Sequence, residues 1–491
     1  MKSKFSKVLS ILLSVVLVIS SFYLLYQVIR LNVLPSKFLF PLTIGVVVLD
    51  AIFILLLIYF SKNVVSKIVC ILLTLFICVA TCMGGYYISK TQNVLSNITN
   101  VAKHAKNTVS VIVKESSSIK NKSQLNGVSV GSLRLNEQGS KKTLKELSGE
   151  GIVLNQTEYD SMTALLEAFY NGDVDSIIIN ESSRSQILDI EAYSNFDSNT
   201  RVVYQTSYKV KNNDSATSVS DITSKPFNVL ISGSDTRGGF DENGRSDVIM
   251  IATVNPKTHT ILLTSVPRDF YVTTACDAGD GCMQGALDKI THTGIHGTNT
   301  TKRTVEQLLG IEINYTFKVG FDTVTKLVDT LGGVDVTVAP GYAVHNEYIN
   351  VKEGVNHLYG EEALEYARER YAYAEGDRQR TKNQQQVLMG IVKEATKPSV
   401  ITNYAAIMDT MANTFSTTMS NAEITDLIKY QLNNNPTWKM EQYMVDGTGD
   451  TLMCAELGDA ASVMVPDQST VKMAKDKINA VLAGKSSEDV K

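Results

Sequence analysis

The chain has 491 residues, and 46 Lys and Arg against 50 Asp and Glu give it a net charge of -4. This near balance argues against general binding of polyanions, and the 9 Pro and 31 Gly exclude collagen-like or Pro-rich low complexity. The 6 scattered Cys are too few for a disulfide scaffold. The length predicts two or three domains of about 100–200 residues each.

Three apolar segments open the chain, at about residues 8–29, 38–60 and 68–88. Each has about 20 residues, the length that crosses ~30 Å of hydrocarbon. A signal peptide would be shorter and would not recur. Residues 1–90 are therefore predicted to form a membrane anchor with three transmembrane helices.

Basic residues predict the orientation of this anchor. They precede the first segment (Lys2, Lys4, Lys7) and lie between the second and third (Lys62, Lys67). Cytoplasmic loops carry an excess of Lys and Arg, and the first helix usually dominates. We therefore expect a multi-pass cell-membrane protein with a cytoplasmic N-terminus. Three spans would then place the soluble domains outside the cell.

Two predicted segments and a small domain follow the anchor. Residues 91–123 are polar and indicate a helical or flexible stalk. Over residues 124–211 short strands, among them residues 151–154, alternate with helical stretches, which is typical of a small parallel α/β domain. Its pattern GDVDSIII (172–179) is weakly similar to half of a solute-binding lobe, but no ligand residues are recognisable, so an accessory or spacer domain is expected. Residues 212–224 are rich in Ser, Thr, Asn and Asp and form a predicted linker.

A larger α/β domain is predicted over residues 225–485, with a tail at 486–491. Residues 227–231 form an apolar strand, and the runs 247–254 and 260–266 flank a turn, as in a hairpin. Helical and strand patterns alternate further along the chain. The expected architecture is a central mixed sheet flanked by helices.

Charged residues lie at the ends of the first three strands of this domain. They are Asp235, Arg237, Arg245, Asp247, Arg268 and Asp269. The start of one strand of an antiparallel hairpin lies beside the end of its partner, and counting from the turn puts Asp247 opposite about Val266. Two Asp and several Arg are therefore expected at one edge of the sheet.

A second basic group lies further along the chain. Arg368 and Arg370 share a face only in an extended segment, so the preceding helix is expected to end near Ala367 if both serve one site. Arg380 and Gln384 share one face near the N-terminus of the next helix, a position that favours an anion.

Paired Asp and clustered Arg suit a metal-bound phosphate. Carboxylates hold Mg²⁺, and phosphate oxygens complete its coordination shell. Arg presents a planar fork that matches phosphate. Surface salt bridges between these Asp and Arg residues remain the alternative on spacing alone. No GxxxxGK[ST] motif occurs, so an ATP-driven mechanism is not indicated.

Two cysteines, Cys276 and Cys282, flank the polar loop DAGDG (277–281). Outside the cell they are expected to form a disulfide, with two free thiols as the alternative. Cys454 would then remain unpaired.

Seven motifs resemble those of the LytR–CpsA–Psr family of membrane-anchored wall-polymer transferases, in order and in spacing. They are ISGSDTR (231–237), GRSDVIMIATVNP (244–256), SVPRDFYV (265–272), DKITH (288–292), GGVDVTV (332–338), LYGEEALEYARER (358–370) and GDRQRTKNQQQ (376–386). The three-span anchor and the extra domain are similar to the capsule-linked streptococcal branch. The chain departs from the family at Thr291, which usually is Asn, and at Asn383, where many members have a further Arg.

The resemblance implies a site for polyprenyl pyrophosphate with Mg²⁺ (or Mn²⁺) as cofactor. Asp235 and Asp247 would hold the metal. The implied pyrophosphate ligands are Arg237, Arg245, Arg268, Arg368, Arg370 and Arg380, with Gln384 nearby. The implied catalytic residues are Asp247, Arg268 and Asp269, with one of the two Asp as general base. The lipid tail would lie in an apolar tunnel between the sheet and the helices.

The function implied in this way is transfer of a capsular or other wall glycopolymer from undecaprenyl pyrophosphate to peptidoglycan, by Mg²⁺-assisted phosphoryl transfer. The partners would be the lipid-linked polysaccharide, peptidoglycan, membrane lipids and capsule assembly proteins, without nucleic acid. Two alternatives are a membrane regulator that senses lipid-linked intermediates and attenuates transcription, and a polyprenyl pyrophosphatase. Only about seven residues precede the first apolar segment, so a cytoplasmic DNA-binding domain is not expected.

Overall fold

The computed structural model describes most of the chain: residues 2–60, 63–101, 104–211, 215–234, 242–276, 281–397, 406–407, 410 and 415–490. They form two compact units. The first holds the N-terminal helices and α13 (Asn421–Asn434), and the second holds the two α/β parts of the chain.

Three long apolar helices make up most of the first unit. They are α1 (Lys2–Leu31), α2 (Ser36–Leu55), which continues into a short π-helical turn (Leu56–Phe60), and α3 (Val64–Val101). Segments Lys7–Leu31, Ser36–Tyr59 and Val64–Val94 are long and apolar enough to cross a membrane, which confirms three candidate spans. Helix α3 also runs through the first residues of the predicted stalk.

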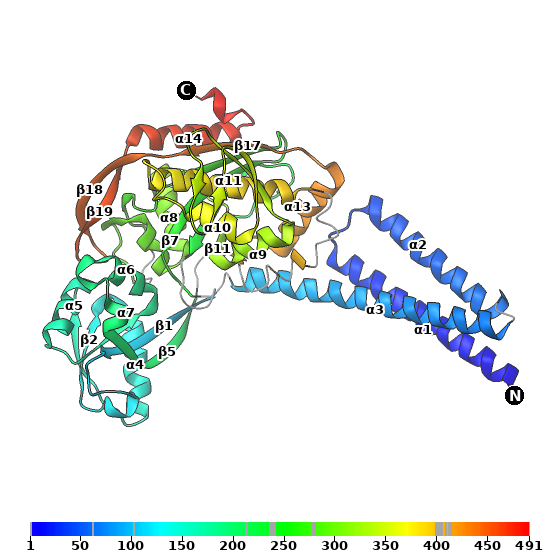
Figure 1. Ribbon diagram of the computed structural model, residues 1–491, viewed down its shortest axis with the longest axis horizontal. Helices are drawn as coiled ribbons and strands as arrows, with labels where there is room; N and C mark the ends of the chain where they lie inside the picture. The colour runs from blue at the N-terminus through cyan, green and yellow to red at the C-terminus, as the bar shows by residue number, and fades with distance from the viewer. Residues whose placement is uncertain are drawn as a thin grey trace. The chain divides into compact units, whose positions relative to one another are not determined.

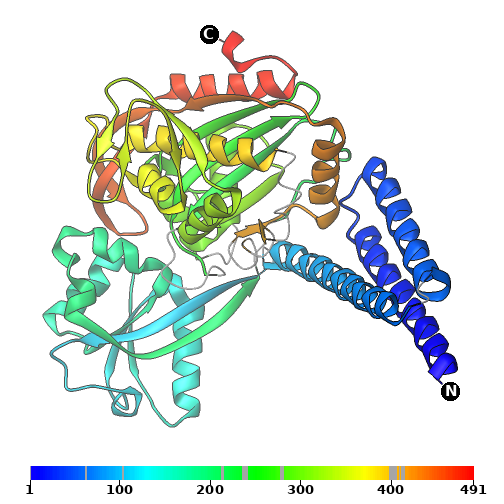
Figure 2. The same cartoon turned by 45° about the vertical axis from the view of Figure 1, so that its right-hand side comes forward.

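The small α/β part of the second unit contains a sheet in the order β3-β2-β4-β1-β5. The strands are β1 (His104–Lys114), β2 (Ser129–Leu133), β3 (Asn155–Tyr159), β4 (Ser176–Asn180) and β5 (Thr200–Lys211). Figure 2 shows the long strands β1 and β5 side by side. Helices α4 (Glu137–Gly149) and α5 (Met162–Asn171) connect the parallel strands, and α6 (Arg184–Asp189) and α7 (Phe196–Asn199) precede β5.

The structure corrects the prediction for this domain in three places. Strand β1 lies in the segment predicted as a stalk, because its apolar residues Val109, Val111 and Val113 follow a polar stretch that hid them. Since β1 is antiparallel to β4 and β5, the sheet is mixed rather than parallel. Residues 151–154, predicted as a strand, form the turn after α4, where Gly151 has a φ of 82°.

The larger α/β part is built on a six-stranded mixed sheet (Figure 1). From edge to edge its strands are β16 (Phe415–Thr417), β11 (Tyr315–Gly320), β6 (Phe227–Ser234), β7 (Ser246–Asn255), β8 (Thr260–Val266) and β17 (Lys439–Met444). The pairs β11–β6 and β8–β17 are parallel, and the others are antiparallel. The predicted α/β fold with a mixed sheet is confirmed.

Successive side chains of each strand point to opposite faces of this sheet, and a different group of helices covers each face. Leu230, Ile249 and Ile251 face a core shared with α8 (Thr298–Leu309) and α14 (Gln468–Leu482). Their sequence neighbours Ile231 and Met250 face the opposite side. That side is covered by α9 (Phe321–Leu331), α10 (Gly360–Arg368) and α11 (Asp377–Ala395).

The register of the β7–β8 hairpin differs by two residues from the predicted one. Asn255 pairs with Thr260 across a four-residue turn, so Val266 lies opposite Ile249 rather than Asp247. The same register carries Asp247 to the level of Arg268, just beyond the end of β8. The two charged residues are thus closer than the sequence count suggested.

Smaller elements surround the sheet. They are β9 (Tyr271–Thr273) with β10 (Leu287–Lys289), the 3-10 helix η6 (Ile290–His296), β12 (Val334–Val338) with β15 (Gly354–Leu358), β13 (Val344–His345) with β14 (Asn350–Val351), and β18 (Gly447–Cys454) with β19 (Asp459–Pro466). Short 3-10 turns occur at Lys122–Gln124, Arg134–Asn136, Glu181–Ser183, Glu191–Tyr193 and Ser487–Asp489.

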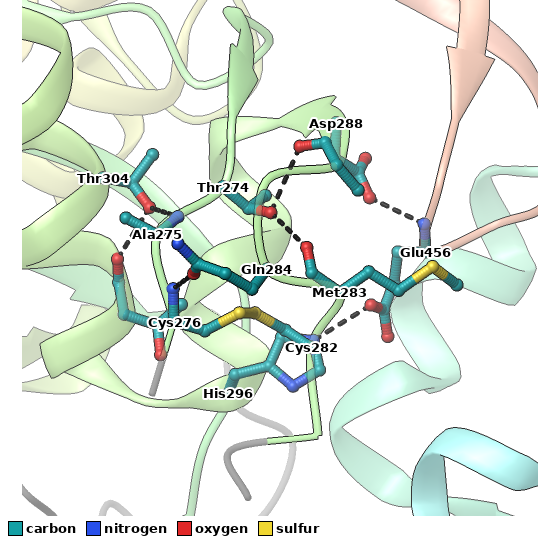
Figure 3. The surroundings of a disulfide bond; sticks show 12 residues. Thr274, Ala275, Cys276, Cys282, Met283, Gln284, Asp288, His296, Thr304 and Glu456 are labelled. Atoms are coloured by element: carbon teal, nitrogen blue, oxygen red, sulfur yellow. Dashed lines mark hydrogen bonds and ion pairs between the residues drawn. A yellow bond between two sulfur atoms is a disulfide. The ribbon is translucent and has the colours of Figure 1, made fainter. Parts of the chain in front are cut away.

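A disulfide closes the loop after β9. Cys276 and Cys282 are bonded, with their Cα atoms 6.3 Å apart, as the sequence predicted. Figure 3 shows this disulfide beside Gln284, whose side-chain oxygen accepts a 2.5 Å hydrogen bond from the backbone N–H of Cys276. Cys454 is a free, buried thiol.

Candidate functional site

The centre of the site is a buried ion pair at the end of the β7–β8 hairpin. Arg268 donates from Nη1 to Asp247 Oδ1 over 2.9 Å, and the Thr291 hydroxyl donates to the same oxygen over 3.2 Å. Arg245 Nη2 lies 3.8 Å from the other carboxylate oxygen. The Asp247 side chain is only 10% exposed, so it is held among donors in a fixed position.

A glycine lets the 3-10 helix η6 approach β7 closely enough to bring Thr291 to this carboxylate. A Cβ atom on Gly294 would lie 2.5 Å from the backbone nitrogen of Ser246 and from the carbonyl oxygen of Gly244. Neither backbone atom can yield easily, so a larger residue would push η6 away. Thr291, which departs from the family's Asn, still supplies a hydrogen-bond donor to Asp247.

Asp269 is the most accessible carboxylate of the hairpin end. Its Oδ2 lies 3.7 Å from Arg268 Nε, and its Oδ1 lies 3.4 Å from Lys289 Nζ. The side chain is 31% exposed. Arg268 therefore lies between a buried carboxylate and a half-buried one.

The second basic group reaches the first from the N-terminus of α11. Arg380 forms an ion pair with Asp377 one turn earlier, and its side chain is 13% exposed. Burial lowers the pKa of Arg380, and the nearby cations Arg268 and Arg370 lower it further, outweighing the attraction of Asp377. Arg268 and Arg370 thus each lie within electrostatic reach of Arg380.

Arg368 and Arg370 straddle the end of α10. The helix ends at Arg368 and Glu369 is extended, with φ -63° and ψ 127°, so the expected break is confirmed within one residue. The guanidinium of Arg368 lies over the Phe321 ring, 5.3 Å from its centroid. Arg370 instead donates from Nη2 to the Tyr371 hydroxyl over 2.7 Å.

Charge and burial act in opposite directions on the central pair. Burial raises the pKa of Asp247, but Arg245 and Arg268 outweigh it, and the pKa lies below its usual range. Burial likewise lowers the pKa of Arg268, whereas Asp247 and Asp269 raise it, and the net shift is upward. Both groups are therefore fully charged at neutral pH.

Three guanidinium groups keep unused hydrogen-bond donors. Within the described residues, the buried Nε atoms of Arg245, Arg268 and Arg380 make no hydrogen bond. Buried polar atoms normally have partners, and each exception calls for an explanation. Charge-assisted bonds to phosphate oxygens would satisfy all three donors.

An apolar cavity lies beside the arginines, between the sheet and α9, α10 and α11. It encloses about 610 Å³, including its solvent-filled mouth. Ile231, Met250, Val324 and Leu388 are among its lining residues. Arg368 and Gln384 also line it, so basic and amide groups border an otherwise apolar space. The predicted apolar space between sheet and helices is present.

The structure leaves part of the predicted site undescribed. Asp235 and Arg237 lie outside the described residues, so the proposed metal pair stays a prediction. Elsewhere in the described chain, no three His, Cys, Asp or Glu side chains gather to hold a metal. Arg245 is brought to the site, and it also forms an ion pair with Asp189 of the small α/β part.

Two contacts in the site were not predicted from the sequence. Asp377 pairs with Arg380, a contact that their spacing of three residues on one helix could have indicated. Lys289, which neutralises Asp269, comes from β10 and carries no local signal.

The family of the chain follows from comparison with known proteins. Residues 192–480 match the LytR_cpsA_psr family, which is more than half of the chain. The chain therefore belongs to the LytR–CpsA–Psr family, as the seven motifs indicated.

Individual relatives carry names that describe an activity. A *Bacillus cereus* protein named polyisoprenyl-teichoic acid–peptidoglycan teichoic acid transferase TagU is 30% identical over 243 residues, 49% of this chain and 77% of the relative. The *Bacillus subtilis* protein of that name is 36% identical over 196 residues, 40% of this chain and 60% of the relative.

Solved structures of similar proteins cover about half of the chain. Protein gbs0355 from *Streptococcus agalactiae* has 26% identity and a TM-score of 0.46, over 53% of this chain and 89% of that one. The *B. subtilis* TagU structure has 29% identity and a TM-score of 0.40, over 52% and 97%.

Proposed function

We propose that this protein transfers a wall glycopolymer from a polyprenyl-pyrophosphate carrier to a sugar hydroxyl of peptidoglycan. The observation that carries the proposal is that an apolar cavity and basic side chains lie together. Arg368 and Gln384 border an apolar cavity, and Arg380, which has an unused donor, lies one helical turn before Gln384 on α11. A lipid tail with a pyrophosphate head has the same division of apolar and anionic parts.

The TagU relatives support this assignment, because their names describe transfer of polyisoprenyl-linked teichoic acid to peptidoglycan. Undecaprenyl pyrophosphate as the carrier and a capsular or teichoic-type polysaccharide as the cargo are our finer proposals. The apolar lining of the cavity suits part of a prenyl chain, and the rest of the chain would stay in the membrane.

The reaction moves a phosphoryl group between two oxygens. The acceptor hydroxyl attacks the phosphorus atom that bears the polymer, the bond from that phosphorus to the bridging oxygen breaks, and polyprenyl phosphate leaves. Arg268, Arg370 and Arg380 bind the two phosphates and stabilise charge that develops on the leaving oxygen. Stabilisation of this kind carries most of the catalysis in phosphoryl transfer.

We assign the general base to Asp269 rather than to Asp247. Arg245 and Arg268 hold the pKa of Asp247 below its usual range, and its Oδ1 already accepts two hydrogen bonds, so it takes up a proton poorly. Asp269 is 31% exposed and lies beside Arg268, where an acceptor can reach it. The proton of the acceptor hydroxyl would pass to this carboxylate.

We propose that Mg²⁺ or Mn²⁺ assists, with Asp247 and Asp235 as protein ligands. Asp247 Oδ2 fits this role, because Arg245 Nη2 lies 3.8 Å from it, beyond hydrogen-bond distance, whereas Oδ1 accepts hydrogen bonds from Arg268 and Thr291. Few protein carboxylates are available, so phosphate oxygens of the substrate would complete the shell. When bound, the ion would neutralise charge on the phosphates.

The proposal places the soluble domains outside the cell, where peptidoglycan lies. It follows the orientation that the lysines before the first helix indicate. Membrane lipids and capsule assembly proteins would be further partners in that place.

The test is an in vitro reaction with the full-length protein in nanodiscs, a polyprenyl-pyrophosphate-linked oligosaccharide, Mg²⁺ and peptidoglycan. We expect a covalent polymer–glycan product and polyprenyl phosphate. Release of free phosphorylated polymer without attachment would instead identify a pyrophosphatase. If neither product forms and the lipid is bound unchanged, the alternative of a lipid-sensing regulator is supported.

A further inference from the structure

Three tyrosines in the described soluble part expose most of their surface, and one of them, Tyr371, contacts Arg370. Tyr371 is 86% exposed and Tyr348 is 68% exposed. Tyrosine is enriched at interfaces, where its ring contacts an apolar surface and its hydroxyl stays in water. Neither side chain packs in a core, so their conformation needs another cause.

Tyr371 is held against a residue of the candidate pyrophosphate site. The guanidinium of Arg370 lies over its ring, 4.7 Å from the centroid, and donates to its hydroxyl over 2.7 Å. One face of the ring is thus fixed by a cation, while most of the side chain remains exposed. Arg370 follows Arg368, a lining residue of the cavity, by two residues, so the ring lies near the cavity at the rim of the arginine cluster.

Tyr348 is carried on a turn that is tied to the turn of Tyr371. Glu369 accepts a 2.8 Å hydrogen bond from the backbone N–H of Tyr371 and a 2.9 Å hydrogen bond from the side chain of Asn346. The oxygen of Asn346 in turn accepts from the backbone N–H of Tyr348 over 2.9 Å. One carboxylate and one amide therefore hold both tyrosine-bearing turns together.

We propose that Tyr348 and Tyr371 form a binding platform for the glycan strand that accepts the polymer. A sugar ring presents an apolar face of C–H groups and a polar edge, which matches the apolar body and polar tip of tyrosine. Aromatic residues held rigidly in loops bind at low conformational cost. This inference rests on the proposed function for the identity of the glycan as acceptor.

The acceptor glycan needs such a platform more than the lipid-linked donor does. The donor is held by its lipid in the cavity and by its phosphates at the arginines. The acceptor has no such anchor, and its hydroxyl must still be kept near the reacting phosphorus. Contacts of its own with the rim of the arginine cluster would supply this positioning. The platform therefore belongs to the acceptor rather than to the sugars of the donor.

The first experiment measures binding without chemistry. Chitotetraose, a soluble β-1,4-linked N-acetylglucosamine oligomer, serves as the probe for the full-length protein in nanodiscs, followed by calorimetry. We expect Tyr371→Ala and Tyr348→Ala each to weaken binding about ten-fold, as truncation of an aromatic anchor does at 1.4 kcal/mol per decade. Tyr348→Phe should bind like the wild type, because the ring remains. Unchanged binding in both alanine variants would overturn the platform.

The matched control is Tyr359→Ala. This tyrosine is 56% exposed and packs on the His357 ring with centroids 5.2 Å apart, and among the described residues its side chain has no hydrogen bond or ring contact with an arginine. Its loss should leave chitotetraose binding unchanged. Equal weakening in the control would also contradict the assignment.

The second experiment separates the acceptor from other occupants. In the transfer assay, Tyr371→Ala should raise the apparent KM for peptidoglycan about ten-fold and leave the affinity for the lipid-linked donor unchanged. A loss of donor affinity would assign the platform to donor sugars, and weaker binding to glycan-free vesicles of anionic lipid would assign it to the membrane. Either result overturns the inference. If no transfer occurs but the tyrosines still govern chitotetraose binding, the proposed function fails and the glycan platform stands.

Discussion

Replacement of Arg268 by Ala tests the site most directly. The side chain is 19% exposed and joins two carboxylates, with 2.9 Å to Asp247 and 3.7 Å to Asp269. Its loss removes a charge-assisted contact to phosphate and leaves Asp247 with fewer partners. Truncation of one member of a buried charged contact typically costs about 2–5 kcal/mol. At 1.36 kcal/mol per decade, this corresponds to a rate loss of about 30-fold to several thousand-fold.

The assay measures polymer attached to peptidoglycan by the purified protein, together with polymer shed by cells that carry the variant. Arg268→Lys should recover only part of the rate, since an ammonium group cannot form the bidentate fork. The variant should remain folded, because Thr291 and Arg245 still face Asp247. Circular dichroism and the melting temperature check this point.

Arg378→Ala is the matched control. Arg378 belongs to the same motif as Arg380, but it donates to Asp446 over 2.7 Å and to the carbonyl of Gly447 over 2.9 Å, and it is 42% exposed. An exposed pair of this kind is worth about 1 kcal/mol or less. Its loss should leave attachment nearly intact. The reasoning would be refuted if Arg268→Ala kept attachment within about ten-fold of wild type, or if the control lost as much.

Three further outcomes are expected. Val324→Trp should fill the apolar cavity and weaken binding of long polyprenyl phosphates more than that of short ones, at about 0.8 kcal/mol per excluded CH₂ group, in a lipid-length titration. Because the folded pKa of Asp247 is lowered, its stabilising effect should be present above the unfolded pKa of about 3.9 and be lost as the pH falls through the folded value. Urea titrations of wild type and Asp247→Asn should therefore converge below about pH 4. Mg²⁺ should bind weakly alone and at least about ten-fold more tightly with a polyprenyl pyrophosphate, and equal calorimetric affinities would contradict the assignment of the phosphates as ligands.

Local patterns predicted much of the fold. Two apolar runs that flank a turn located the β7–β8 hairpin, and the length of the N-terminal apolar runs identified three candidate membrane helices. Strand β1 was missed because its first residues are polar and its apolar residues pair with strands far along the chain. The predicted register of the β7–β8 hairpin was wrong by two residues, because the register depends on how the turn at 256–259 closes rather than on residue types.

Those parts of the candidate site that depend on the residue pattern of a single segment could be predicted from the sequence. The spacing of Arg368 and Arg370 predicted a helix end near Ala367, and α10 ends one residue later, at Arg368. The contact of Thr291 with Asp247 depends instead on Gly294, whose lack of a side chain allows η6 to approach β7. The close approach of η6 to β7 is a property of tertiary packing, and it cannot be predicted from the spacing of residues in the sequence.

The charge balance of the site explains why metal and substrate binding should be coupled. Arg268 faces Asp247 and Asp269, and Arg380 faces Asp377, so these cations are largely neutralised within the chain. A pyrophosphate bound at these arginines would bring its own negative charge close to Asp247, Asp269 and Asp377. The arginines then have to be shared between phosphate and carboxylate oxygens. A divalent cation between Asp247 and the phosphates would turn that repulsion into attraction, so each would raise the affinity for the other, as linkage requires. On this proposal, the buried carboxylates would form part of the binding site for the anion rather than only compete with it for the arginines.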